Sequence, residues 1–350
     1  MSLQLHIPEP LRGVDLAPWF RQQGDGALFS RAARSTFFDS VERVAPEAAC
    51  AMVLPHNFLR LDDAARAYIK QYADMGEKLG MPVILFSLGD YSDSLQFDSR
   101  VVVLRLSVYR STLRPNDVVM PTLTEDIGAE RFVLRAKQEV PVVSFCGRAA
   151  FTSMRERVAS WVRRLKYEAL GLVRKEERAR IRGIFWRQWM MRVCERSALV
   201  KTLFIVRSTF SGALRTIEIS PEQARKDFIQ NVAEADFVLA PKGDGNYSNR
   251  FLEALSMGRI PVVVDTDMVL PFEDTIDYGR VMVRVPMGRV AETPRYIHEF
   301  YTTLDEAGWR ERQELARTVF VEHLAVDAFF KHFFDTVVTC AASPEQPPQE

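Results

Sequence analysis

The fold of this chain is decided by the stretch Phe237-Val-Leu-Ala-Pro-Lys-Gly-Asp-Gly-Asn-Tyr-Ser-Asn-Arg-Phe-Leu-Glu-Ala-Leu-Ser-Met-Gly-Arg-Ile-Pro-Val-Val-Val264. Short apolar runs at residues 237–239 and 260–264 predict two buried strands. Between them, Ser248 is the expected N-cap of a helix that Gly258 ends. The stretch therefore predicts a compact strand, helix and strand unit, which is the building block of a parallel sheet.

The turn before this helix is typical of a site that holds a nucleotide phosphate. Gly243 and Gly245 can adopt backbone angles that other residues avoid, and a helix start offers free N–H groups and a positive dipole end. Arg250 and Glu253 lie three residues apart and so share one helix face. Arg250 could bind a diphosphate, and Glu253 could accept hydrogen bonds from ribose hydroxyls. The alternative is an exposed ion pair within the helix.

Four segments of this region together resemble the signature of the exostosin family of glycosyltransferases. They are Phe237-Val-Leu-Ala-Pro-Lys-Gly-Asp-Gly245, Arg250-Phe-Leu-Glu-Ala-Leu255, Gly258-Arg-Ile-Pro-Val-Val263 and Leu270-Pro-Phe-Glu-Asp274. The resemblance implies an α/β chain of GT-B type, with two Rossmann-like doubly wound domains facing a central cleft. It also implies an inverting transfer of a sugar from a nucleotide-sugar donor, with a UDP-sugar expected.

The resemblance assigns the donor site residue by residue. Arg250 is expected at the donor diphosphate and Glu253 at the donor ribose. The loop around the phosphates is expected to contribute Lys242, Gly243, Gly245, Ser248 and Asn249. The family usually has Cys, Arg and Trp at the positions of Arg259, Lys242 and Tyr278, so its known sugars are not transferred to this chain.

Composition bounds the class of protein. The chain has 350 residues, of which 47% are hydrophobic and 26% charged, and this is the balance of a globular protein with two domains. It has 46 basic and 46 acidic residues, so its overall charge predicts no nucleic-acid partner. Four scattered cysteines predict neither a metal site nor a cofactor, and the donor itself is the expected co-substrate. The chain shows no signal peptide and no long apolar run, so we expect a bacterial cytoplasmic protein.

Strands and helices alternate in the first 140 residues. Apolar runs predict strands, and apolar residues at helical spacing predict a helix, as follows: strands at 49–54, 82–88, 100–107 and 117–120, and a helix at 61–79. Ligands bind beyond the carboxyl ends of such strands, where the chain carries His56, Asp90 and Asp126. Each is a candidate for the general base that deprotonates the acceptor hydroxyl, and each could instead be an ordinary turn or cap residue.

The second half opens with a strand that runs into Gly147 and Arg148. In the exostosin family a comparable strand opens the donor domain, so Arg148 is expected at the donor phosphates or the acceptor, unless it simply faces solvent. Four parts of the chain follow from these boundaries: an acceptor-side domain at 1–140, a donor-binding domain at 141–318, a helix returning to the first domain at 319–340, and a disordered tail at 341–350.

Residues 150–196 are strongly basic, with 13 lysines and arginines against 5 acidic residues. Met154, Val158, Trp161 and Leu165 recur at helical spacing, which predicts a basic amphipathic helix. Three interpretations stay open: a solvated helix whose apolar side joins the core, a basic wall that attracts an anionic glycan, and peripheral attachment to an anionic membrane.

The leading hypothesis is a glycosyltransferase that acts on an oligosaccharide or polysaccharide acceptor, anionic or lipid-linked, in bacterial surface polysaccharide synthesis. A second hypothesis is an NAD(P)-dependent oxidoreductase, because Gly243-x-Gly245-x-x-Ser248 approximates a dinucleotide-binding motif and Asp265 ends the next strand. A third is a catalytically silent glycan-binding relative. Stabilisation by UDP but not by NAD(H) separates the first hypothesis from the second.

Overall fold

The computed structural model describes residues 3–21, 35–59, 61–90, 97, 100–207 and 220–341. The chain divides into two compact units. Unit 1 comprises Met1–Val108, Thr112–Leu123 and His323–Glu350, and unit 2 comprises Tyr109–Ser111 and Thr124–Glu322. Short 3-10 helices occur at Pro18–Phe20, Pro46–Ala48, Arg110–Thr112, Lys175–Arg180, Tyr278–Arg280 and Met287–Glu292.

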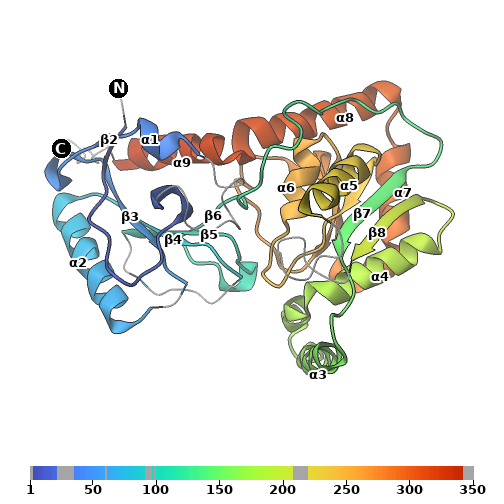
Figure 1. Cartoon of the computed structure of the whole chain (residues 1–350), viewed down its shortest axis with the longest axis horizontal. Helices are drawn as coiled ribbons and strands as arrows, with labels where there is room; N and C mark the ends of the chain where they lie inside the picture. Colours follow the sequence, from blue (N-terminus) through green and yellow to red (C-terminus); the bar gives the residue numbers. More distant parts are fainter. Residues whose placement is uncertain are drawn as a thin grey trace, which may run out of the picture. The chain divides into compact units, whose positions relative to one another are not determined.

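Unit 1 is built on a parallel sheet of six strands. Their order across the sheet is β2 (Glu42–Arg43), β1 (Gln4–His6), β3 (Ala51–Asn57), β4 (Val83–Ser87), β5 (Val101–Arg105) and β6 (Asp117–Val119). Helix α2 (Asp63–Leu79) packs on β3 and β4, and side chains such as Met52, Ile69 and Leu85 form the core between them (Figure 1). The carboxylate of Asp62 caps the start of α2, and Gly80, with φ of 71°, ends it.

The C-terminal helix α9 (Val326–Ala341) belongs to unit 1 and is anchored there by aromatic side chains. The Phe330 ring lies 4.8 Å from Trp19 and 4.9 Å from Phe38, which belongs to the short helix α1 (Phe37–Ser40). Phe334 stacks on Phe37 at 5.3 Å. The chain enters α9 through a turn of π-helix at Phe320–Leu324, directly after α8.

Unit 2 contains a second parallel sheet, of five strands. Their order is β11 (Val283–Pro286), β10 (Ile260–Asp265), β9 (Phe237–Leu239), β7 (Val142–Arg148) and β8 (Lys201–Arg207). From β7 the chain first moves outward to β8 and then returns to the other side of β7 through β9 and β10. The direction of winding therefore reverses between β7 and β9, which is where such sheets bind ligands, at the carboxyl ends of the strands.

Helices cover both faces of this sheet (Figure 1). Right-handed crossovers place α5 (Pro221–Ala233) and α6 (Asn249–Ser256) on the face opposite α4 (Gly183–Glu195). Helix α4 packs against α7 (Thr293–Thr302), and α6 packs against α8 (Glu306–Val319). No helix among the described residues combines the length and the apolar character needed to cross a membrane.

The two parallel α/β units confirm the expected fold class, and the expected cleft between them stays a prediction. Strand β1, only three residues long, was not predicted. The strand, helix and strand unit forms as expected, with α6 between β9 and β10 and with Gly258 at φ of 63° directly after the helix. The end of the tail, at 342–350, lies outside the described residues.

The segment at 124–140 groups with unit 2, ahead of the boundary expected near residue 141. The segment forms hydrogen bonds and an ion pair with unit 2. Arg135 pairs with the buried Asp236 at 3.0 Å, and its backbone N–H donates to Gln313 at 2.8 Å. Arg259 is buried and donates from Nη2 to the carbonyls of Val133 and Ala233, at 3.0 and 3.1 Å. These contacts explain why the boundary between unit 1 and unit 2 lies before residue 124 and not near residue 141.

Candidate nucleotide-binding site

A pocket of about 220 Å³ lies in unit 2 between the first turns of α5 and α6, beside the carboxyl end of β7. Its position agrees with the site expected at the reversal of the winding. It is lined by Cys146 of β7, by Asn249, Arg250 and Glu253 of α6, and by Pro221, Ala224, Arg225 and Phe228 of α5. The pocket thus contains both residues that the helical spacing singled out.

Arg250 is fixed against β7. Its Nε donates to the carbonyl of Cys146 at 3.0 Å, and its guanidinium lies 4.7 Å from the centre of the Phe145 ring. Gly147, with φ of 145°, leaves room for this guanidinium, because a Cβ there would lie 1.9 Å from Nη2. Burial lowers the pKa of Arg250 below its ordinary value. The predicted glycine at the end of this strand is therefore required by its close approach to Arg250.

Glu253 lies one turn deeper along α6 and faces Arg225. The two charged groups are 3.5 Å apart, and the side chain of Glu253 is 17% exposed. Burial raises the pKa of Glu253 above its ordinary value, although Arg250 and Arg225 oppose the shift. Arg225 also pairs with Glu125 at 2.8 Å. The sequence analysis missed Arg225, since one arginine on an ordinary helix gives no signal before the fold places it beside Glu253.

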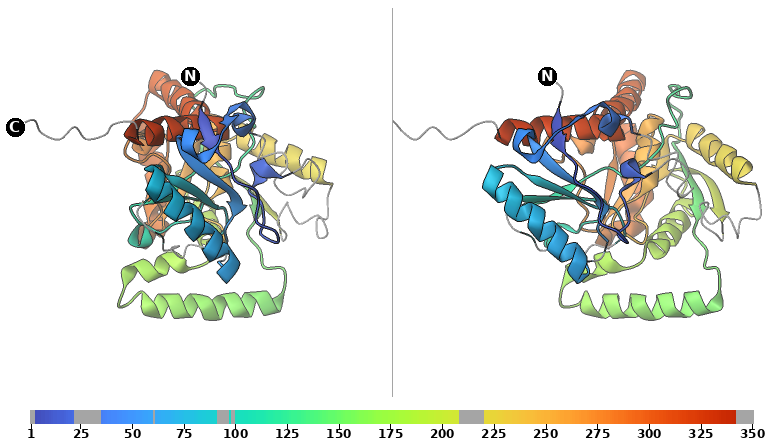
Figure 2. Two further views of the ribbon diagram at one scale, coloured as in Figure 1. Left: turned by 90° about the vertical axis from the view of Figure 1, so that its left-hand side faces the viewer. Right: turned by 60° about the vertical axis from the view of Figure 1, so that its left-hand side comes forward.

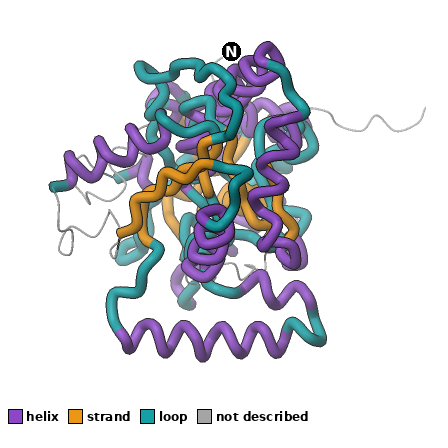
Figure 3. Tube along the Cα trace, turned by 90° about the vertical axis from the view of Figure 1, so that its right-hand side faces the viewer, coloured by secondary structure: helices purple, strands orange, loops and turns teal. Residues whose placement is uncertain are grey.

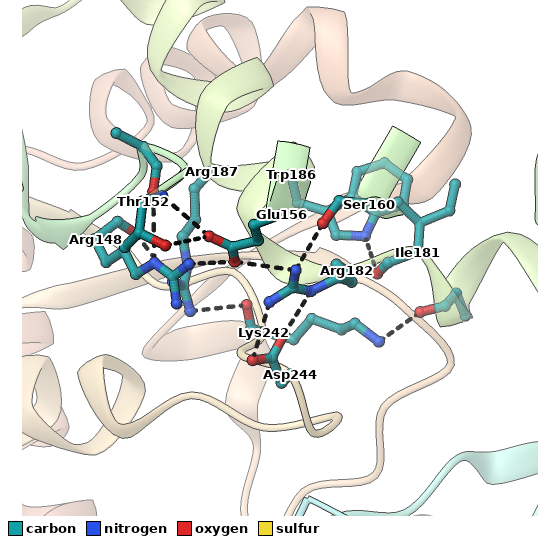
Figure 4. A network of polar contacts seen from close by, with 12 residues as sticks. Arg148, Thr152, Glu156, Ser160, Ile181, Arg182, Trp186, Arg187, Lys242 and Asp244 are labelled. Carbon is teal, nitrogen blue, oxygen red and sulfur yellow. Dashed lines mark hydrogen bonds and ion pairs between the residues drawn. The ribbon is translucent and has the colours of Figure 1, made fainter. Parts of the chain in front are cut away.

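Four arginines gather near the ends of β7 and β9, and we call them the arginine cluster: Arg148, Arg182, Arg187 and Arg250. Only Glu156 and Asp244 pair with them among the described residues. Figure 4 shows Glu156 between Arg148 and Arg182, with Asp244 beside Arg182.

Arg187 shows the excess of positive charge most clearly. Its guanidinium donates to the carbonyls of Arg148 and Lys242, at 3.0 and 3.3 Å. Burial, followed by the charge of Arg250, lowers the pKa of Arg187 to about 9, and Asp244 only partly offsets these effects. An anion bound here would offset the charges of Arg250, Arg148 and Arg182, which together with burial lower the pKa of Arg187.

In the loop expected to bind the phosphates, Lys242 does not have the position that the sequence predicts for a phosphate ligand. Lys242 is buried, and its Nζ donates to the Ala179 carbonyl at 2.7 Å and to the Tyr109 hydroxyl at 2.9 Å. Burial lowers the pKa of Lys242 to about 7. Lys242 therefore has a structural position in which its amine is already bonded to protein groups, as Figure 4 shows for its bond to the protein carbonyl.

The glycines of this loop also differ from the expectation. Positive φ angles occur at Gly147 and Gly258 but not at Gly243, whose N–H donates to the Tyr247 carbonyl at 2.8 Å. Gly245 is buried. Among the described residues, Lys242, Gly243, Gly245, Ser248, Gly147 and Arg148 do not line the pocket, whereas Asn249 does. Ser248 is the N-cap of α6, but within the described part of the chain its buried hydroxyl has no hydrogen-bond partner.

The three candidate bases occupy different settings. His56 lies within β3 and is fully buried, with Nε2 accepting a hydrogen bond from the Leu11 N–H at 2.8 Å. Burial lowers its pKa. Asp126 is held by both Nη atoms of Arg317, one of them at 2.8 Å. These contacts give His56 and Asp126 structural roles. Asp90 is exposed, past the carboxyl end of β4, and stays a prediction as a base.

Asp265, the ribose-binding residue of the oxidoreductase hypothesis, ends β10 as expected. Its carboxylate is 40% exposed and lies 3.9 Å from Arg284, on the neighbouring strand β11. Asp265 is also not part of the lining of the pocket that holds Arg250 and Glu253. In the described ranges, no three His, Cys, Asp or Glu side chains come together in a group that could hold a metal ion.

The chain thus consists of two parallel α/β units, with a pocket where the winding of the second sheet reverses. Residues 157–300 match the Exostosin GT47 domain. Part of unit 2 is therefore similar to the exostosin GT47 domain, which confirms the resemblance seen in the sequence.

Proteins similar in sequence to part of this chain include animal and plant proteins. An Exostosin-1 homolog of Caenorhabditis elegans is 31% identical over 103 residues, which are 29% of this chain and 26% of that protein. Exostosin-1 of Drosophila melanogaster is 39% identical over 69 residues, which are 20% of this chain and 9% of that protein. The chain thus spans about a quarter or less of the length of these relatives.

Solved structures similar to this chain include two glycosyltransferases. One is from Rickettsia africae ESF-5, with a TM-score of 0.40 and 8% identity over 98% of this chain and 100% of that one. The other is WaaG, described as a glycosyltransferase involved in lipopolysaccharide biosynthesis, with a TM-score of 0.40 and 10% identity over 98% of this chain and 100% of that one. Scores of this size support no assignment by themselves.

Proposed function

We propose that this protein is a glycosyltransferase that binds the nucleotide of its sugar donor in the pocket between α5 and α6. The observation that carries the proposal is the arginine cluster at the winding reversal, whose four guanidinium groups form ion pairs, among the described residues, with Glu156 and Asp244 only. A donor diphosphate would supply the missing negative charge. During transfer, charge grows on the leaving diphosphate, so arginines fixed in advance stabilise the transition state more than the ground state.

Arg250 and Glu253 have separate roles in this proposal. Arg250 would contact the diphosphate, because its guanidinium is already oriented by Cys146 and Phe145. Glu253 would accept hydrogen bonds from the ribose hydroxyls, and the neighbouring charge of Arg225 favours its ionised form. We propose that no resident metal is needed, so that EDTA leaves transfer unchanged. A UDP-sugar donor, an inverting outcome, a bacterial surface polysaccharide as acceptor and a cytoplasmic location stay predictions of the family resemblance.

The test is calorimetric titration of the full chain with UDP, GDP and NADH. We expect UDP to bind, Glu253→Ala to weaken binding by about 1.5–3 kcal/mol through loss of charged hydrogen bonds, and Arg250→Ala to lower turnover more than binding. Arg295→Ala and Glu299→Ala are matched controls, since these residues form an exposed pair on α7, 2.7 Å apart. The proposal fails if NADH binds and UDP does not, or if both site variants behave like the controls.

Turnover separates an enzyme from a silent relative. Release of UDP from a panel of UDP-sugars should be measurable in the wild type and reduced in Arg250→Ala. Tight binding of UDP without release from any donor would favour the glycan-binding alternative.

A further inference from the structure

Helix α3 (Met154–Leu170) exposes large apolar side chains. Met154 is 68% exposed, Leu165 is 64% exposed and Val162 is 63% exposed, and Val158 and Trp161 lie on the same side of the helix. We call these five residues the α3 apolar face. The chain continues into Leu172 and Val173, which are 79% and 87% exposed. Exposed apolar residues normally occur singly, so a contiguous group of this size indicates a binding surface.

The helix is attached to unit 2 chiefly by its polar side, and from the apolar face the ring of Trp161, which is 42% exposed, packs 5.2 Å from Phe185 of α4. Arg182 donates to Ser160 at 2.7 Å and to Glu156 at 3.2 Å, and Glu156 also pairs with Arg148. On the wheel of the helix, Glu156 and Ser160 lie opposite Leu165. A surface helix of a globular protein usually buries its apolar side and exposes its polar side, whereas α3 does the reverse. Figures 2 and 3 show α3 at the periphery of unit 2.

The flanks of the apolar face are basic. Between residues 154 and 175 the chain has seven lysines and arginines and two acidic residues. Both acidic residues are paired, Glu156 as above and Glu168 with Arg164 and Arg178 at 3.4 Å each. Within the described part of the chain, Arg155, Arg157 and Arg163 form no ion pair. The surface around the apolar face therefore carries uncompensated positive charge.

We propose that α3 binds the surface of a membrane that contains anionic lipids. An apolar side at the boundary of headgroups and acyl chains, flanked by arginine and lysine, is the arrangement by which helices lie in a bilayer interface. Arg155, Arg157 and Lys166 flank this face and contact lipid phosphates, and the α3 apolar face enters the interface together with Leu172 and Val173. The single sign of the charge favours this occupant over a second copy of the chain, which would bring the same positive charge to the contact. The inference does not depend on the proposed transferase activity.

Co-sedimentation of the full chain with vesicles is the test. We expect binding to vesicles of phosphatidylcholine with phosphatidylglycerol, little binding to pure phosphatidylcholine, and loss of binding at high salt. Replacing Arg155, Arg157 and Lys166 by Gln should weaken binding roughly a hundredfold, since each charge contributes about fivefold. The matched control replaces Arg43, Arg66 and Lys78 of unit 1 by Gln and removes the same charge.

Val162→Gln with Leu165→Gln tests the apolar contribution. This double variant should lose at least about tenfold in vesicle binding, whereas Val133→Gln, at a site 66% exposed elsewhere in unit 2, should bind like the wild type. The fluorescence of Trp161 should shift to the blue on binding, and Trp161→Phe should remove that shift. Circular dichroism confirms that each variant is folded.

Two results would overturn the inference. One is that the wild-type chain does not bind anionic vesicles at low salt, or that the α3 variants bind them as tightly as the wild type does. The other is a dimer in sedimentation velocity without lipid that Val162→Gln with Leu165→Gln converts to a monomer, because the apolar face would then join two copies.

Discussion

Gly147 leaves the space in which the guanidinium of Arg250 lies. A side chain at position 147 would displace that guanidinium from the pocket. A Cβ at Gly147 would lie 1.9 Å from Nη2 of Arg250, and the backbone has φ of 145°, which side-chain-bearing residues avoid. We therefore predict that Gly147→Ala weakens UDP binding at least about tenfold, measured by calorimetry. The control is Gly288→Ala, where a Cβ meets nothing within 4 Å. Equal binding by the two variants would show that Arg250 does not contact the nucleotide.

At the scale of single residues, the sequence predicted Arg250 and Glu253 because local helical spacing places both on one face. It could not predict Arg225 or Arg187, since each reaches the site only through packing between elements far apart in the sequence. It also gave Lys242 the wrong role. The amine of a lysine beside a glycine turn suggests a phosphate contact, whereas here it is bonded to Ala179 and Tyr109.

Glu156 holds the base of α3, and its ionisation couples that attachment to pH. Burial alone would raise the pKa of Glu156, but hydrogen bonds from Thr152 and the charge of Arg148 outweigh it and lower the pKa to about 2, from an ordinary value of 4.5. A lowered pKa stabilises the fold above the ordinary value, and the stabilisation is lost as pH falls from 4.5 towards 2.

We predict that Glu156→Gln lowers the free energy of unfolding by on the order of 3 kcal/mol at pH 7, and that the difference from wild type vanishes near pH 2. Urea denaturation at a series of pH values measures it. Glu168→Gln on the same helix removes more exposed pairs and should cost less than about 1 kcal/mol. A cost of the same size in both variants would contradict the role of Glu156.

Helix α9 should contribute strongly to the stability of unit 1 through Phe330. This ring is fully buried and contacts Trp19 and Phe38. Phe330→Ala should lower the free energy of unfolding by about 3–5 kcal/mol in urea denaturation, because it leaves a cavity among aromatic rings. Lys331→Ala, on the exposed side of the same helix, should change it by less than about 0.5 kcal/mol. A small effect of Phe330→Ala would mean that α9 is only loosely held.

Elements with strong periodicity and a clear stop signal were predictable. Helix α2 ends at Gly80 and α6 ends before Gly258, and both glycines take the positive φ that ends a helix. Strand β1 was not predictable, because three residues are too few to show a strand pattern and its place comes from pairing with β2 and β3. The pattern of α3 predicted an amphipathic helix correctly but could not show which side faces the protein, since that depends on Arg148 and Arg182.

The uneven distribution of charge along the chain predicts binding to a cation-exchange resin, which the net charge alone would not predict. The chain has equal numbers of acidic and basic residues, yet residues 150–196 carry 13 basic and 5 acidic ones. We predict that the protein binds a cation-exchange resin at pH about 7.5 despite its near-zero net charge, because a resin responds to the local patch. Replacing Arg155, Arg157 and Lys166 by Gln should advance elution to lower salt more than the same change at Arg43, Arg66 and Lys78. Identical elution of the two triple variants would contradict a localised basic surface.

Arg259 shows how this branch diverges from its family. Its guanidinium bonds the carbonyls of Val133 and Ala233 and the side chain of Gln313, whereas the family usually has cysteine at this position. A thiol is too short to reach three such acceptors and offers a single weak donor. A homologue with cysteine here therefore needs other donors for the carbonyl of Val133 and for the segment around it. Grafting that segment from one branch into the other should fail unless position 259 is exchanged with it.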